Sequence, residues 1–262
     1  LCMAVGGSTN AVAHLPAIAG RLGLELPLEL FDRISRETPL IANMRPVGKY
    51  QMQELWEAGG IPAVMKELEP LLRTDALTVT GKTVGENLAG VKKAERWRDV
   101  ILPLNAPLYA EGGLSILRGN LAPDGAVIKH AAASPHLLQH QGRAIVFGSI
   151  QEMMAGVNDP DLDVAPDDIL VMQNGGPVGG PGMPEAGYIP IPKKLLQQGV
   201  RDMVRISDAR MSGTAFGTIV LHVAPEAAVG GPLAAVQTGD IIELDVPNRK
   251  LNLLVPDEEI QR

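Results

Sequence analysis

The chain has 262 residues, of which 45% are hydrophobic and 20% are charged, as is typical of a folded globular protein. Thirty acidic against 23 basic residues give a net charge of −7, and no Lys/Arg cluster could follow a phosphate backbone, so nucleic acid is not an expected partner. No apolar run approaches the roughly 20 residues of a membrane-spanning helix, so we expect no membrane partner either. The single cysteine, Cys2, excludes an intramolecular disulfide and is compatible with the cytoplasm, our default location.

The first part of the chain predicts short helices. Residues 8–20 place apolar side chains on one stripe, with Ser8 as the expected N-cap. His14 lies near that stripe with no second histidine or acid four residues later, so a packed histidine is favoured over a ligand. Residues 50–72 predict two helices separated by Gly59-Gly60, which is an αα-hairpin.

Residues 76–90 predict a strand, a glycine turn and a short helix, and a domain boundary is expected near residue 105. Beyond it the sequence becomes rich in short β-like runs, with helices only at 150–155 and 192–198. The last of these runs, at 240–255, alternates as expected for a hairpin. This succession of short β-like runs predicts a closed or half-closed β-barrel. Its strands would come from LSILRG, GAVIKHA, RAIVFGS, DILVMQN, DMVRISD, GTIVLHV and DIIELDV.

The loop at residues 174–190 packs six glycines and four prolines around a single carboxylate, Glu185. Glycine permits unusual backbone angles and proline fixes them, so the mixture predicts one defined loop shape. The loop lacks both nucleotide-binding glycine patterns, and by itself it could simply be a stiff connection. A carboxylate held after a strand could also bind a hard cation such as Mg²⁺ through oxygen.

A second loop, residues 207–218, gathers four hydroxyl residues with an aspartate, an arginine and two glycines between two β-like runs. The simplest interpretation is a turn closed by side-chain hydrogen bonds. Ser212 lies between Met211 and Gly213, which does not match the G-x-S-x-G nucleophile elbow. Hydrolysis by a Ser-His-Asp triad therefore gains no support.

Longer motifs extend over most of the chain: GGSTNAVAHL (6–15), AGGIPAVMKEL (58–68), GGLSILRGNLAPDGAVIK (112–129), GGPGMPEAG (179–187) and SDARMSGTAFGT (207–218). Together they resemble the dihydroxy-acid dehydratase and sugar-acid dehydratase family, which includes 6-phosphogluconate dehydratase. The segment SDARMSGT is more similar to the aldonate branch of that family, of the arabinonate and xylonate type. Dihydroxy-acid dehydratase of branched-chain amino-acid synthesis is the alternative enzyme, and a ligand-binding β-barrel without catalysis is the non-enzymatic one.

The resemblance implies an α/β fold class in which the C-terminal part of an α/β domain is followed by a swivelling β-barrel-like domain. Residues 1–105 would be the end of the cluster-binding α/β domain, and residues 106–262 the barrel. We expect both ends to be cut from a longer protein, with the cluster ligands and the other Mg²⁺ ligands upstream. Cys2 matches none of those ligands, so we interpret it as a small buried hydrophobe.

The resemblance also implies a hydro-lyase that converts a 2,3-dihydroxy sugar acid to a 2-keto-3-deoxy acid. Its cofactors would be Mg²⁺, with Glu185 as a ligand, and an iron–sulfur cluster of the 2Fe–2S or 4Fe–4S type as Lewis acid. Ser212 would take the α-proton, and Thr214 would bind substrate. We expect this chain alone to be inactive, and the full-length protein to form a homodimer or homotetramer.

Overall fold

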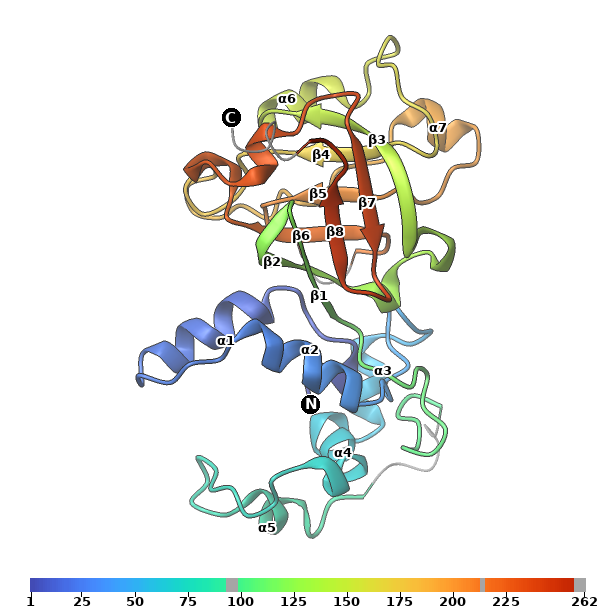
Figure 1. Ribbon diagram of the computed structural model, residues 1–262. Coiled ribbons are helices and arrows are strands. Elements are labelled where there is room, and N and C mark those ends of the chain that lie inside the picture. The colour runs from blue at the N-terminus through green and yellow to red at the C-terminus, as the bar shows by residue number, and fades with distance from the viewer. Residues whose placement is uncertain (93–98, 213–214, 257–262) are drawn as a thin grey trace. The chain divides into compact units, whose positions relative to one another are not determined.

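The computed structural model describes residues 1–92, 99–212 and 215–256 (Figure 1). The chain divides into two compact units, each treated separately below. Unit 1 contains Leu1–Gly7 and Arg33–Gly113, and unit 2 contains Ser8–Asp32 and Leu114–Arg262. Helix α2 (Leu28–Glu37) begins in unit 2 and ends in unit 1. Within the described part of the chain, no helix combines the length and the apolar character needed to span a bilayer.

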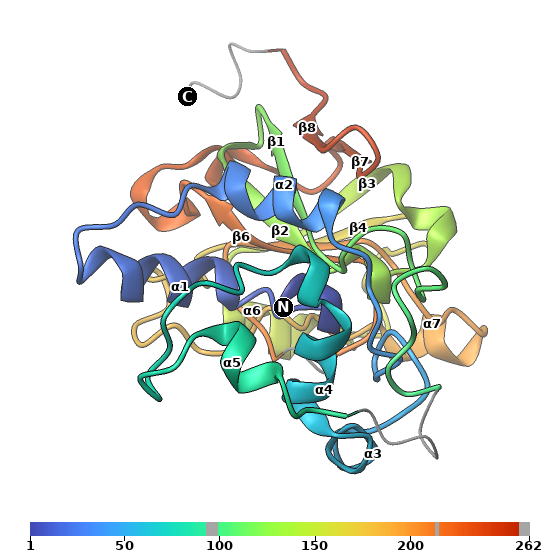
Figure 2. The ribbon, with the colours of Figure 1, turned by 90° about the horizontal axis from the view of Figure 1, so that it is seen from below.

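Unit 1 is built from short helices. The predicted αα-hairpin is confirmed, because α3 (Met52–Glu57) and α4 (Gly60–Glu67) are separated at Gly59. The φ of Gly59 is 111°, and a Cβ there would lie 2.7 Å from that of Ala63, so this junction requires glycine. Figure 2 shows α4 beside both α3 and α5 (Val84–Leu88), in agreement with the contacts that α4 makes with each of them.

One prediction in this unit is wrong. The strand expected at the start of residues 76–90 is only an isolated bridge between Leu77 and Thr83. Val79 is fully exposed, so the β-branched residues of this segment have no sheet to pack on. The described residues of the unit also form two 3-10 helices, Met3–Val5 and Glu69–Leu71. Its core includes Ile41, Leu55, Val64, Leu68 and Ile101.

Unit 2 is a closed barrel of eight strands in the order β1-β2-β6-β5-β4-β3-β7-β8, which confirms the predicted barrel (Figure 1). Parallel pairing joins β3, β4, β5 and β6, and the single residue pair Arg118↔Lys250 closes the barrel between β1 and β8. The strands are β1 (Ser115–Gly119), β2 (Ala122–Ile128), β3 (Gln139–Phe147), β4 (Ile169–Met172), β5 (Arg205–Ser207), β6 (Ile219–Ala224), β7 (Ile241–Asp245) and β8 (Lys250–Leu253).

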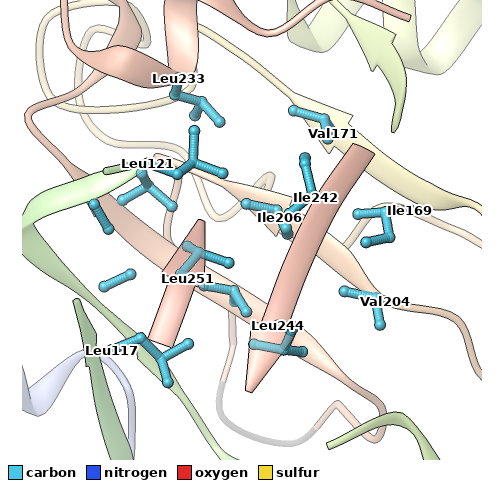
Figure 3. Close-up of a cluster of buried hydrophobic side chains, with 14 of the residues drawn as sticks. Leu117, Leu121, Ile169, Val171, Val204, Ile206, Leu233, Ile242, Leu244 and Leu251 are labelled. Carbon is cyan, nitrogen blue, oxygen red and sulfur yellow. The ribbon is translucent and has the colours of Figure 1, made fainter. Parts of the chain in front are cut away.

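The barrel is filled by alternate aliphatic side chains of its strands (Figure 3). The predicted hairpin is β7 and β8, in which Ile242 and Leu244 face the core. A second apolar layer lies between the outer faces of β3 and β4 and the two predicted helices, which are α6 (Ile150–Gly156) and α7 (Lys193–Gln197). Strand β4 is therefore buried on both faces, which explains its unbroken apolar sequence.

Helix α1 (Ala11–Gly20) is also assigned to unit 2, and it begins later than expected. Asn10, not Ser8, occupies the N-cap position, and its side chain makes no capping hydrogen bond. The Ser8 hydroxyl instead accepts from the backbone N–H of Asn10 at 3.3 Å. The remaining 3-10 helices of this unit are His130–Ala132, Pro135–Leu137, Ala227–Val229 and Pro232–Ala235.

Parallel pairing of β4 and β5 positions the two candidate loops. Met172 at the end of β4 pairs with Ser207 at the end of β5. The carboxyl ends of parallel strands meet at one edge, so the loops that follow them start side by side. Residues 174–190 and 208–218 are therefore neighbours by topology.

Candidate active site

Direct hydrogen bonds join the two loops, which we call the Glu185 loop (174–190) and the Ser212 loop (208–218). The backbone N–H of Gly187 donates to the carbonyl of Arg210 at 2.8 Å. In the other direction, Nε of Arg210 donates to the carbonyl of Met183 at 2.6 Å. The sequence-predicted carboxylate and hydroxyl therefore belong to adjoining segments.

Glu226 fixes the first part of the Glu185 loop. Its carboxylate accepts from the backbone N–H of Val178 at 2.8 Å and from that of Gly179 at 3.1 Å. A Cβ at Gly176 would lie 2.4 Å from the Glu226 carboxylate, so that position requires glycine. The glycines thus let a buried acid approach the backbone.

The Glu185 side chain is 44% exposed and has two polar neighbours. Nη1 of Arg210 lies 3.9 Å from Oε1, and Nδ2 of Asn10 donates to the same oxygen at 3.4 Å. Neither contact is short, so the carboxylate retains lone pairs for a ligand.

Asn10 also reaches the second loop, because its Nδ2 donates to the carbonyl of Met211 at 3.1 Å. Sequence reasoning missed this residue, since the segment before α1 was interpreted as a helix start and as part of a family motif, with no role assigned to Asn10. The residue separations, 175 to Glu185 and 201 to Met211, explain why no local pattern reveals the contact.

Ser212 directly follows Met211 and is exposed. Thr214, the expected substrate-binding residue, lies outside the described residues. His14 is exposed, not partly buried, and the expectation that it is no ligand stays a prediction. The structure therefore brings the Ser212 segment and Glu185 to one end of the barrel unit.

A buried ion pair holds the base of the Ser212 loop. Nη2 of Arg205 lies 2.8 Å from Oδ1 of Asp202, and both side chains are almost fully buried. Asp202 also accepts from the N–H and hydroxyl of Thr218 and from the N–H of Ser134. Burial opposes ionisation of Asp202, but these bonds and the charge of Arg205 outweigh it and lower the pKa of the carboxyl.

Asp208 couples the two loops at their start. Its carboxylate accepts from the backbone N–H of Gly175 at 2.8 Å and from that of Ala227 at 2.9 Å. Burial raises the pKa of Asp208, assisted by the nearby charge of Glu226, although its hydrogen bonds act in the opposite direction. This acid is a structural clamp between segments distant in sequence.

His222 on β6 is a further residue that sequence reasoning did not find. It has a φ of 53°, which is uncommon for a residue other than glycine, and its N–H donates to the carbonyl of Ala209 at 3.1 Å. Burial, together with the charges of Arg210 and His14, lowers the pKa of His222 to about 4. The imidazole is thus neutral at neutral pH. It also borders an apolar cavity of about 180 Å³.

Comparisons with known proteins find two family models that match the chain and several similar relatives. Residues 1–87 match the family described as dihydroxy-acid/6-phosphogluconate dehydratase N-terminal, and residues 99–262 match its C-terminal counterpart. An L-arabinonate dehydratase of Rhizobium leguminosarum is 57% identical, and an L-arabonate dehydratase of Azospirillum brasilense is 55% identical. A dihydroxy-acid dehydratase of Methanothrix thermoacetophila is 45% identical.

Each alignment covers 99% of this chain, and it covers 45% of the first two relatives and 47% of the third. The chain therefore spans about half the length of the curated relatives it matches. The two aldonate dehydratases are more similar to it than the dihydroxy-acid dehydratase, in agreement with the resemblance of SDARMSGT to the aldonate branch. The chain belongs to the dihydroxy-acid/6-phosphogluconate dehydratase family.

Proposed function

We propose that this chain forms part of a hydro-lyase that removes water from a sugar acid of the aldonate type to give a 2-keto-3-deoxy acid. The observation that carries the proposal is the junction of the Glu185 and Ser212 loops, made by Arg210 and Asn10. The aldonate-dehydratase names of the relatives at 57% and 55% identity support the substrate class.

The reaction has two difficulties. The hydrogen next to a carboxylate is weakly acidic, and hydroxide is a poor leaving group. A site for this reaction therefore needs a base near the α-carbon and positive charge where negative charge develops. Ser212 is suited to the first task, and Glu185 can serve the second by holding a cation.

The carboxylate of Glu185 is suited to serve as a Mg²⁺ ligand. Among residues 1–92, 99–212 and 215–256, no three His, Cys, Asp or Glu side chains gather closely enough to hold a metal ion by themselves. Mg²⁺ commonly takes one or two carboxylates and completes its shell with water and substrate oxygens, so a single accessible carboxylate suits one position of that shell. A bound Mg²⁺ would stabilise the negative charge that develops on the acid when its α-proton leaves.

An iron–sulfur cluster does not fit this chain by itself. Clusters are held by several thiolates, and Cys2 is the only cysteine of the sequence. Cys2 is partly exposed, which differs from the small buried hydrophobe expected from the sequence.

Ser212 is proposed to accept the α-proton as its alkoxide. An alkoxide needs nearby positive charge, because a serine hydroxyl is otherwise a very weak acid. Arg210 lies only two residues before Ser212 in the chain. Its guanidinium is held near the Glu185 loop by its bond to the carbonyl of Met183. Asn10 fixes the carbonyl of Met211, the residue before the serine.

The test is a substrate panel on the protein in its natural full length. It compares pentonates and hexonates with 2,3-dihydroxy-3-methylbutanoate, the branched acid that suits the alternative enzyme. We expect keto-acid formation with a higher kcat/KM for an aldonate. Preference for the branched acid would favour dihydroxy-acid dehydratase, and binding without turnover would favour a non-catalytic barrel.

A further inference from the structure

Asn10 contacts both loops through one amide nitrogen. Its Nδ2 donates to Oε1 of Glu185 at 3.4 Å and to the carbonyl of Met211 at 3.1 Å. Both partners are acceptors, so the orientation of the amide follows from the hydrogen-bond network. Its oxygen must therefore face elsewhere.

That oxygen, Oδ1 of Asn10, is buried and has no hydrogen-bond partner among residues 1–92, 99–212 and 215–256. Only four buried side-chain atoms share this property within the described ranges; the other three are Oγ1 of Thr9, Oγ of Ser207 and Nε2 of His222. Thr9 is 1% exposed, and Ser207 is fully buried. Buried polar atoms are rarely left without a partner, because an unsatisfied one costs about 1–3 kcal/mol.

Thr9 and Asn10 precede α1, Ser207 ends β5 immediately before the Ser212 loop, and His222 is bonded through its backbone to Ala209 in that loop. The unsatisfied oxygen of Asn10, on a residue that contacts both loops, indicates a place where a polar ligand completes the bonding.

We propose that Asn10 is a ligand-binding residue of this site: its amide nitrogen keeps the Glu185 and Ser212 loops in register, and its amide oxygen accepts a hydrogen bond from a hydroxyl of the bound sugar acid. The hydroxyl contact rests on the proposed function. A neutral amide oxygen suits a hydroxyl donor and disfavours the negative carboxylate of the acid, so Asn10 orients the hydroxyl-bearing part of the ligand.

The amide oxygen is not a second ligand for a cation held by Glu185. The nitrogen of the amide, not its oxygen, faces that carboxylate. A cation between Glu185 and Asn10 would require the opposite orientation. The contact therefore predicts an effect on hydroxyl recognition, not on the Mg²⁺ requirement.

The experiment uses the protein in its natural full length and a series of aldonates, each with one hydroxyl replaced by hydrogen. Binding of each acid is measured by calorimetry for the wild type, Asn10→Ala, Asn10→Asp and the control Asn158→Ala. Asn158 is an exposed asparagine of the same unit that belongs to neither loop and accepts from the backbone of Lys193.

We expect one member of the series to bind wild type roughly 2- to 10-fold more weakly than its parent acid, as for one lost hydrogen bond. Asn10→Ala should bind that pair equally, because the acceptor is gone. Asn10→Asp retains an oxygen and should keep the discrimination, although its charge weakens binding of every acid. The control should behave as wild type.

Amide hydrogen exchange gives a second readout that needs no turnover. Both Asn10 variants lose the amide nitrogen, so exchange at Gly187 should accelerate in both, and it should not change in Asn158→Ala. Unchanged exchange in Asn10→Ala would overturn the role of the amide nitrogen.

The hydroxyl contact is overturned if Asn10→Ala discriminates every pair as wild type does, or if its only change is a higher Mg²⁺ requirement. A wild-type protein that binds none of these acids would contradict the proposed function and the hydroxyl contact with it. If wild type binds these acids and Asn10→Ala discriminates each pair as wild type does, only the assignment of Asn10 is contradicted.

Discussion

The backbone N–H of Gly175 donates to the Asp208 carboxylate at 2.8 Å, and this bond joins the first residues of the Glu185 loop to those of the Ser212 loop. The other oxygen of Asp208 accepts from the N–H of Ala227. One buried acid thus satisfies donors from two segments, and its removal should affect both loops.

Asp208→Asn should lower the free energy of unfolding by about 1–3 kcal/mol, because an amide can accept from only one of the two N–H donors and its own NH₂ faces the other. Turnover should fall as well, since the loops lose a shared anchor. Urea unfolding and steady-state kinetics measure the two effects. The matched control is Asp124→Asn on an exposed part of β2. Equal unfolding curves for the two variants would contradict the role of Asp208 in holding the two loops together.

Arg205→Met should be more severe. It leaves the Asp202 carboxylate buried without its cation, and breaking a buried ion pair in this way costs about 3–5 kcal/mol. Arg118→Met removes an exposed ion pair with Glu29 and should cost much less. Similar midpoints in urea for the two variants would show that the buried pair does not stabilise the loop base.

Ser212→Ala should abolish turnover and leave the fold intact, because Ser212 is exposed and its truncation creates no cavity. Circular dichroism and urea unfolding should match wild type, while keto-acid formation should disappear. Near-normal turnover would rule out Ser212 as the base.

Glu185→Gln should raise the Mg²⁺ concentration needed for half-maximal activity, since it replaces a charged oxygen ligand with a neutral amide. Glu25→Gln, at an exposed acid of the same unit, is the charge-matched control. Identical Mg²⁺ titrations for both variants would remove Glu185 from the metal site.

His222 should make stability depend on pH. Its pKa is about 4 in the folded chain and 6.5 ordinarily, so the unfolded chain binds the extra proton first as the pH falls. The stabilising effect of the neutral imidazole is complete above about pH 6.5 and is lost progressively toward pH 4, with a maximum of about 3 kcal/mol.

His222→Gln should therefore remove part of the loss of stability that wild type shows between pH 6.5 and 4. His136→Gln, at an exposed histidine of the same unit, should retain that loss. Because other acids titrate equally in all three proteins, the difference between their unfolding free energies isolates His222. Parallel pH curves would contradict its burial as a neutral ring.

Local patterns predicted much of the fold. Short β-like runs identified the strands of the barrel, alternation identified its last hairpin, and Gly59-Gly60 marked the break between α3 and α4. The same reasoning failed for residues 76–80, because β-branched residues form a strand only where a partner strand and a buried face exist.

The site was less accessible to sequence reasoning. Glu185 and Ser212 were conspicuous because glycine, proline and hydroxyl residues surround them. Asn10 lies in the motif GGSTN, but its partners, like those of His222, are reached only after the barrel has closed. Parallel pairing of β4 and β5 is also a tertiary feature, and it is what brings the two loops together.

The most direct test of the account follows the α-proton itself. The protein in its natural full length is given an aldonate with deuterium at C2, and keto-acid formation is compared with that from the unlabelled acid, for wild type and for Ser212→Ala. The account predicts slower wild-type turnover of the deuterated acid and no product from the serine variant. Turnover by Ser212→Ala at the wild-type rate, with the same isotope dependence, would show that another group removes the proton.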